Sequence, residues 1–409
     1  AMMSGPDEGP VNADLARDTA RRVVAEHGDT SLSARTVGDV SNVVQVANLW
    51  IDAVTDFPAA AGGGTALSRA EWVEQTLPVW RSLTEPVAIG VRSAMSSAME
   101  SQMKELGEAG GEMQMPGMPP GMNPADLMGQ MQPMVARMSS AMFGAQVGQA
   151  VGGLAGEIVS GTEVGLPLMP EEQVALLPAN VALFAEGLEV DSGEVHLYLA
   201  AREAARARLF AGVAWLGPQL LTAVQDYARD ISIDTDAIES AVRSVDPSDP
   251  SAMQEALADS LFTPEQSAPQ KAALRRLETL LALVEGWVDD VSGRACSPHL
   301  PQTSALAEAV RRRRATGGPA EKVFASLVGL ELRPRRLRDA ANLWAALEAA
   351  RGSAGRDAAW AHPDVAPSAE DLDDILGYVE GSAESDGSGS ALDAEIDQLL
   401  RDENPSSGA

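Results

Sequence analysis

Cysteine and aromatic residues are scarce in this sequence. Cys296 is the single cysteine among 409 residues, so no internal disulfide is possible within the chain. One lone cysteine favours a reducing compartment and a role for Cys296 as core filler. Aromatic residues make up 4% of the chain and hydrophobic residues 45%. A core supplied mainly by alanine and leucine predicts a mainly α fold.

Long apolar runs and an excess of basic residues are also absent. No run of 18 apolar residues occurs, and we expect neither a transmembrane helix nor a signal peptide, hence a cytoplasmic protein. The 30 basic residues are outnumbered by 59 acidic ones, which gives a net charge of -29. That charge argues against non-specific binding to nucleic acid or to an anionic membrane. The sequence contains neither a Walker loop nor a nucleophile elbow.

Composition predicts three regions. We expect residues 1–10 to be a disordered leader or tag. Residues 11–378 are expected to form one mostly helical domain, and residues 379–409 an acidic disordered tail. Inside the domain, the Met-, Gly- and Pro-rich segment 107–126 predicts a flexible loop. Hydrophobic periodicity and turn residues predict helices over residues 13–26, 37–54, 65–81, 86–106, 180–187, 234–244, 272–291 and 340–351.

Glycines recur every four residues at Gly144, Gly148, Gly152 and Gly156. Such a seam allows two helices to approach closely. Polar neighbours within the segment favour a buried helix of a soluble protein over a membrane helix.

Two arginines interrupt an apolar helix face in segment 195–210. At about 100° per residue, Arg202 and Arg206 fall in the centre of that face, whereas Glu203 and Arg208 fall outside it. The apolar residues of the face are Val195, Tyr198, Leu199, Leu209 and Phe210. A buried guanidinium keeps its proton, so it must be paired or reach water. We therefore expect either a pocket or a buried ion-pair network at Arg202 and Arg206.

A second helix supplies candidate acidic partners. Glu285 lies within about 60° of Leu281 and Val288 at the edge of an apolar stripe, and Asp289 follows one turn later. A carboxylate in such a place is a metal ligand, a partner of a buried cation, or a rim residue that reaches solvent. The two inward arginines favour the interpretation that Glu285 is the partner of a buried cation.

A basic cluster, Arg311 to Arg314, precedes Gly317 and Gly318. Cations at the end of a helix complement its dipole, which is the simplest interpretation of this cluster. A site for an acidic partner or a phosphate is the alternative.

The spacing of Arg202, Glu203 and Arg206 is that of a metallopeptidase motif with both histidines replaced. With histidine at both positions, R-E-x-x-R becomes H-E-x-x-H, which places two zinc ligands and a general base on one helix face. This stretch, with Trp215-Leu216 downstream, resembles the actinobacterial family of zinc-dependent metalloproteases and hydrolases, a zincin-like group once associated with deazaflavin-cofactor biosynthesis. The resemblance extends over about residues 35–380 and includes the segments 143–148, 283–289, 311–318 and 330–336.

The resemblance implies a zincin-like helical core with few short strands. It also implies a general-base role for Glu203, a third metal-ligand role for Glu285, and a place for the glycine-seam helix beside the metal site. Arginine cannot donate a lone pair to zinc, and two cations would repel the metal. We therefore expect no metal and no cofactor here, with Arg202 and Arg206 forming salt bridges to Glu203 and Glu285.

A short amphipathic helix is predicted at residues 391–401, after a Ser-, Gly- and acid-rich linker. Its apolar face consists of Leu392, Ile396, Leu399 and Leu400. The segment is typical of a docking peptide for a protein partner, although folding back onto its own domain is the alternative.

Three functions fit the sequence. The first is a catalytically inactive zincin-like protein that acts as a scaffold, adaptor or regulator through protein contacts. The second is a hydrolase. It is either the zinc-dependent metallopeptidase that the resemblance implies, or an enzyme without the usual zinc site, in which Glu203 with Glu285 or Asp289 forms a carboxylate pair assisted by His196 or His299. The third is a protein that binds an anion or small molecule through its inward arginines.

Overall fold

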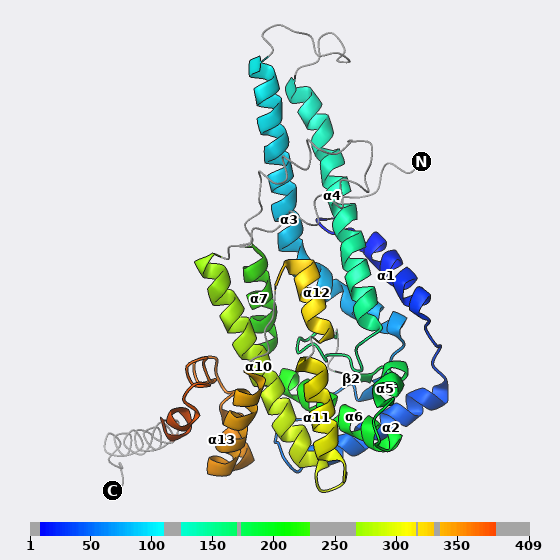
Figure 1. Ribbon diagram of the computed structural model, residues 1–409, viewed down its shortest axis with the longest axis vertical. Coiled ribbons are helices and arrows are strands. Elements are labelled where there is room, and N and C mark those ends of the chain that lie inside the picture. Colours follow the sequence, from blue (N-terminus) through cyan, green and yellow to red (C-terminus); the bar gives the residue numbers. More distant parts are fainter. Residues whose placement is uncertain are drawn as a thin grey trace, which may run out of the picture.

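The computed structural model describes residues 9–109, 124–169, 173–229, 267–315, 318–330 and 336–381. Helices dominate these ranges, and the strands among them are short (Figure 1). This confirms the predicted mainly α fold class. The predicted helix 234–244 and the apolar residues of segment 391–401 lie outside the described residues.

The elements follow one another along the chain as two groups. The first contains α1 (Ala13–His27), α2 (Ala34–Ile51), β1 (Gly64–Ala66), α3 (Arg69–Ala109) and α4 (Pro124–Ala155). The second contains β2 (Val174–Leu176), α5 (Pro178–Ala185), α6 (Ser192–Gly212), α7 (Leu216–Arg229), α10 (Ala268–Cys296), α11 (Thr303–Ala315), α12 (Pro319–Val328) and α13 (Leu337–Ala358).

Side-chain caps set where the two site helices begin. Asp191 precedes α6 and accepts hydrogen bonds from the backbone amides of Gly193 and Glu194. Ser267 and Gln270 form a reciprocal capping box at the start of α10. These caps satisfy amides that have no partner within the helix.

The two helices predicted over 65–81 and 86–106 are one helix, α3, which contains Pro78 and Pro86. Proline removes one helical hydrogen bond and normally ends or kinks a helix. Here the same buried face continues past both prolines, through Trp80, Leu83 and Val87. Packing of that face outweighs the local cost of the prolines.

The predicted loop 107–126 is shorter than expected at both ends. Residues 107–109 belong to α3 and residues 124–126 to α4. The two helices rise together as a hairpin from the rest of the molecule (Figure 1). Residues 65 and 66, predicted as helix, belong to strand β1.

The middle of helix α6, from Tyr198 to Leu209, is buried on every side. It packs against α2, α10, α5, α11 and strand β2. Glu203 is 0% exposed and Arg208 is 1% exposed, so the expectation that both lie off the buried face is wrong. Alanines occupy the remaining positions around the middle of α6 and allow neighbouring elements to approach from all directions. A one-sided amphipathic pattern therefore describes only part of this helix.

The small sheet holds the loop that follows α4. Strands β1 and β2 are parallel, and Thr65 pairs with Ala175. On the other edge of β2, the amide of Gly161 donates to the carbonyl of Ala175 over 2.9 Å, and the amide of Leu177 donates to the carbonyl of Val159 over the same distance. These bonds fix residues 159–161 beside the sheet.

Three of the four seam glycines, Gly144, Gly148 and Gly152, face α1, whereas Gly156 follows the end of α4. A Cβ at Gly144 would lie 2.6 Å from the carbonyl oxygen of Asn12, and one at Gly152 would lie 2.8 Å from Cβ of Val23. Close approach of two helices is thus confirmed. The expectation that this helix packs beside Glu203 and Glu285 is wrong, because α4 packs against α1, α3 and α12; the loop after α4 reaches Glu203 instead.

No single helix in the described ranges is long and apolar enough to cross a membrane. Helices α6 and α7 pass the length and composition test only as a pair, with a bend of 91° between them.

Candidate functional site

Glu203 is held by the loop between α4 and β2. Its Oε2 accepts from the Ser160 hydroxyl at 2.7 Å, and its Oε1 accepts from the Thr162 amide at 2.8 Å and the Thr162 hydroxyl at 2.9 Å. Arg206 adds a fourth donor at 2.7 Å to Oε2. Burial raises the pKa of Glu203, while Arg206 and the two hydroxyl donors oppose that shift. Each carboxylate oxygen therefore has two donors in a fully buried position.

Glu285, on α10, meets three guanidinium groups. Arg202 donates to its Oε2 at 3.2 Å, and Arg206 donates to both of its oxygens, at 3.0 and 3.2 Å. Arg314 of α11 forms the third ion pair. Burial alone would raise the pKa of Glu285, but Arg206, Arg314 and Arg202 outweigh it and lower the pKa to about 2. Glu285 is therefore an ionised carboxylate shared by three cations.

Asp289 completes the pairing of Arg202. The two side chains form an ion pair next to the hydroxyl-bearing ring of Tyr198. Burial works against the charged form of Arg202, but Asp289, Tyr198 and Glu285 more than compensate and raise its pKa. Arg202 therefore stays protonated despite being 4% exposed.

Helix α11 closes the site from the outside. Arg314 ends near Glu285 and also donates to the carbonyl oxygen of Glu163 at 3.3 Å. Arg313 lies 3.5 Å from the carboxylate of Glu163 and 5.6 Å from the ring centroid of Phe184. The basic cluster predicted as a solvated helix end thus contributes two side chains to the interior.

Positive and negative charges balance in this cluster. Four guanidinium groups meet four carboxylates; the residues are Arg202, Arg206, Arg313 and Arg314 with Glu163, Glu203, Glu285 and Asp289. Mutual pairing removes the need for a metal ion to neutralise the acids. A buried network of this kind is stable only while every member keeps its partner.

The residues present do not fit a zinc site. Arginine offers only N–H donors, so Arg202 and Arg206 cannot coordinate a metal. The lone pairs of Glu285 that would face zinc are engaged by arginines. Within the described ranges, no group of three His, Cys, Asp or Glu side chains has a geometry that would hold a metal ion.

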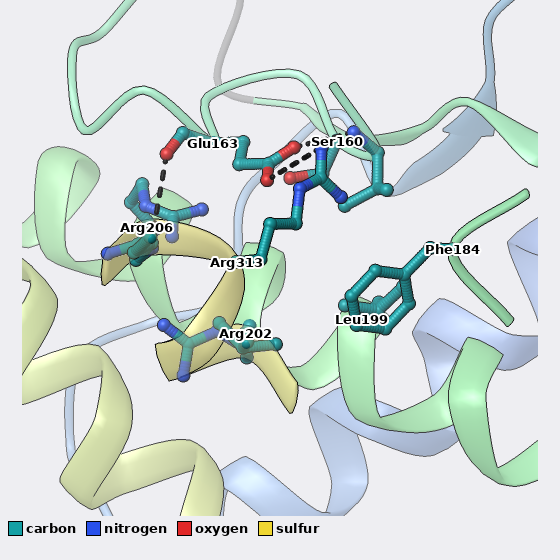
Figure 2. A pocket seen from close by; sticks show the side chains of 10 residues that line it. Ser160, Glu163, Phe184, Leu199, Arg202, Arg206 and Arg313 are labelled. Carbon is teal, nitrogen blue, oxygen red and sulfur yellow. Dashed lines mark hydrogen bonds and ion pairs between the residues drawn. The ribbon is translucent and has the colours of Figure 1, made fainter. Parts of the chain in front are cut away.

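A pocket opens next to the cluster. Its lining has a cationic side with Arg202, Arg206, Arg313 and Arg314, and an apolar side; the remaining lining residues are Val159, Ser160, Glu163, Phe184, Leu199 and Val310. Figure 2 shows Phe184 and Leu199 together on one side, Arg202 and Arg206 away from them, and Arg313 between the two groups. The empty space, including the open mouth, is about 320 Å³.

The structure brings Arg202, Glu203, Arg206, Glu285 and Asp289 together, and the salt bridges expected from Arg202 and Arg206 are present. The roles of Ser160, Thr162 and Glu163 were not predicted from the sequence. Those residues lie in an irregular loop, where periodicity carries no signal. The run of four arginines was the signal for Arg313 and Arg314, but their direction depended on how α11 packs.

The two candidate histidines lie elsewhere. His196 contacts the carbonyl oxygen of Ser192 at 2.8 Å, and His299 stacks on Trp50 with ring centroids 4.5 Å apart. In the part of the chain that the structure describes, neither histidine contacts Glu203 or Glu285. The structure does not bring together the histidine-assisted carboxylate pair.

A second buried ion cluster adjoins the first through consecutive residues of α10. Asp290 pairs with Arg356 of α13 at 3.2 Å, directly after Asp289 pairs with Arg202. Arg356 is 0% exposed and also pairs with Glu348 and Asp357, each at 2.8 Å. This cluster ties α13 to α10 and was not predicted from the sequence.

Comparisons with known proteins point to one family. The family model described as "Zincin-like metallopeptidase" matches residues 11–379. Among solved structures, the chain is similar to a protein titled "Crystal structure of a putative hydrolase with a novel fold from Chloroflexus aurantiacus". The two share 17% identity with a TM-score of 0.55, over 90% of this chain and 97% of that one, which shows the fold alone. No curated protein matches.

Proposed function

Because the chain belongs to the zincin-like metallopeptidase family, we propose that it is a member without metal or peptidase activity, which acts through protein contacts. In this proposal Arg202 and Arg206 stand where H-E-x-x-H carries its two histidines. Glu203 is the vestige of a general base, and Glu285 that of a third ligand.

One observation carries the proposal. Glu285 pairs with Arg202, Arg206 and Arg314 at once, which supports the proposal that protein cations replace the charge of a metal ion. Transferring a charged side chain from water into the protein interior costs several kcal/mol unless ion-pair partners replace the lost solvent. A zinc ion would have to displace three paired guanidinium groups to reach the same carboxylate.

A hydrolytic role has less support. A general base needs access to a water or substrate, whereas Glu203 is 0% exposed and has two donors on each oxygen. A metallopeptidase also needs an ion to activate that water. The family label alone therefore does not carry an activity over to this chain.

The interaction role rests on the C-terminal segment. Leu392, Ile396, Leu399 and Leu400 share one face of a predicted helix that follows an acidic linker. Such a segment offers an apolar stripe to the groove of a partner. We propose a cytoplasmic protein partner for it, because the net charge of -29 disfavours nucleic acid.

The first test is zinc content measured by elemental analysis after dialysis against trace zinc. We expect a ratio near zero per chain for the wild type, because no lone-pair donor is available at positions 202 and 206. We expect Arg202→His/Arg206→His to gain roughly one zinc, since that pair restores the two imidazoles of the motif. Circular dichroism of each variant checks that the helical fold is retained.

The triple variant Arg202→His/Arg206→His/Glu285→Gln is the matched control, because it removes the third ligand. It should return to a zinc ratio near zero. A ratio near one in the wild type would contradict the loss of metal. A folded double variant without zinc would contradict the assignment of positions 202 and 206 as former ligand positions.

A further inference from the structure

Helix α4 carries an apolar stripe that is exposed where the helix belongs to the α3–α4 hairpin. Met134 is 70% exposed and Met138 is 40% exposed, and Ala141 and Ala145 are half-buried after them. Successive members are four, three and four residues apart, which is the spacing of the core positions of a coiled coil. Methionine is flexible and polarisable, so this surface can adapt to an apolar helix laid along it. These four residues are named the α4 stripe.

The α4 stripe lies on a helix with almost no charge. Asp126 and Arg137 are the only charged residues among the 32 of α4, although the chain carries 59 acidic residues. Asp126 precedes Met134 by about two helical turns. Arg137 is exposed and follows Met134 by three residues, so it borders the stripe. An acidic helix laid on the stripe therefore meets a cation, and two copies of this acidic chain can approach each other over α4 with little repulsion.

The C-terminal segment 391–401 has the matching pattern. Leu392, Ile396 and Leu399 are also spaced by four and three residues. In the predicted helix, Glu395 borders this face at about 60° from Leu392, where it can pair with Arg137. Matching apolar spacing and opposite charges beside it are the features that specify how two helices pair in a coiled coil.

The length of the connecting chain decides which copy supplies the segment. Residues 382–390 span at most about 30 Å when fully extended. From Met134 to Ala155, α4 alone covers about 30 Å along its axis. Helix α13 and the described residues after it lie still farther away, at the end of the molecule opposite the hairpin (Figure 1). The segment therefore falls short of the stripe of its own chain, whereas a second copy that runs in the opposite direction brings its segment there.

We propose that the α4 stripe is the docking site for segment 391–401 of a second copy of this chain. In an antiparallel pair the same contact forms twice around a twofold axis. This inference rests on the interaction role proposed above for the segment, and it names one protein that the segment contacts. If the chain does not self-associate but still recovers a different partner through Ile396 and Leu399, only the present inference fails.

The test is sedimentation velocity of the full chain over a wide range of concentrations. We expect the wild type to form dimers as the concentration rises. Met134→Asp puts a charge into the stripe, and Ile396→Asp/Leu399→Asp puts charges on the apolar face of the segment. Each change should weaken self-association by about tenfold or more. Circular dichroism checks that each variant keeps its helical fold.

The matched control is Leu49→Asp, which makes the same kind of change on α2. Leu49 is 69% exposed, against 70% for Met134. Its replacement should leave dimer formation unchanged. A wild type that stays monomeric at every concentration would overturn the inference. Equal weakening by Leu49→Asp and Met134→Asp would do the same, because added charge alone would then explain the loss.

A mixing experiment shows which surfaces meet. Met134→Asp keeps an intact segment, and Ile396→Asp/Leu399→Asp keeps an intact stripe. Their mixture should form more dimers than either variant alone but fewer than the wild type, because one of the two contacts is restored. Contact between two stripes would instead leave Ile396→Asp/Leu399→Asp dimeric, and that result would contradict docking of the segment.

Cross-linking distinguishes a second copy from the segment's own chain. Met134→Cys/Ile396→Cys places one thiol on each surface, and the native Cys296 is buried. A short bifunctional thiol reagent should join two chains, which doubles the mass on a denaturing gel. A link that forms only within one chain would overturn the second copy as the occupant of the stripe.

Discussion

At the scale of single residues, the site is defined by permanent charge inside a core. Arg202, Arg206 and Glu285 are each less than 10% exposed. Isolated burial of any of them would be strongly unfavourable, and mutual pairing offsets that cost. Such a network contributes little net stability as a whole, but removing one member strongly lowers the free energy of unfolding because a charge is left buried without a partner. Single substitutions are therefore informative here.

Replacing Glu285 with glutamine should lower the free energy of unfolding at pH 7 by about 3 kcal/mol, because three arginines lose their shared partner. The effect should depend on pH. Glu285 has a folded-state pKa of about 2 against an ordinary value of 4.5. Its charge therefore stabilises the fold above about pH 4.5, and that contribution is lost as the pH falls toward about 2.

Urea unfolding measures the free energy of unfolding of both proteins at a series of pH values, down to the lowest pH at which the wild type folds. The difference between wild type and Glu285→Gln should shrink as the pH falls. Glu308→Gln is the control, since Glu308 also pairs with arginine but on the surface of α11. A difference of constant size at every pH would argue against an ionised Glu285 in the folded state.

At the scale of elements, small residues decide which helices touch. Alanines around α6 let five other elements pack on it, and the α4 glycines let α1 lie against the backbone of α4. The length of α3 has a different cause, because a continuous buried face carries the helix through Pro78 and Pro86. Local propensity is outweighed wherever such a face is long enough.

Adjacent glycines of α4 should respond with opposite signs. Gly152→Ala places a Cβ 2.8 Å from Cβ of Val23 and 2.9 Å from the carbonyl oxygen of Ala20, so it should destabilise by about 1–3 kcal/mol. Gly153→Ala meets nothing within 4 Å and should stabilise by about 0.5–1 kcal/mol through helix propensity. Thermal unfolding of the two variants compares them directly. Stabilisation by both would mean that α1 does not approach α4 as described.

At the scale of the whole molecule, charge is distributed unevenly. The chain carries a net charge of -29, yet arginines gather in the interior around Glu285 and along α11. A strongly acidic surface repels nucleic acids and keeps the protein soluble. The proposed recognition of a protein partner would then rest on the apolar residues of segment 391–401.

Ile396→Asp/Leu399→Asp should abolish binding to a partner, because both changes put charge on the apolar face of that segment. Ala394→Asp/Gln398→Asp adds the same charge on the opposite face and should leave binding intact. Co-purification with quantitative mass spectrometry compares the two variants with the wild type, and the thermal midpoint of both should equal that of the wild type. Equal recovery of every partner from the two variants would rule out docking through this face.

The sequence by itself determined the mainly α class, the helices that carry the site, and the need for Arg202 and Arg206 to be paired. These follow from periodicity and from the fixed charge of arginine, both local properties of the chain. Only the tertiary structure decided which acids do the pairing. Glu285 lies 79 positions from Arg206, and the donors to Glu203 come from a loop 41 to 43 positions away.

Tertiary structure alone also decided that α6 is buried all round and that Arg313 and Arg314 point inward. The number of elements that surround a helix is not encoded in its own residues. A cation at the end of a surface helix can face water or a neighbour with equal local propensity. Arg314 faces inward because Glu285, on another helix, provides a buried opposite charge at that point.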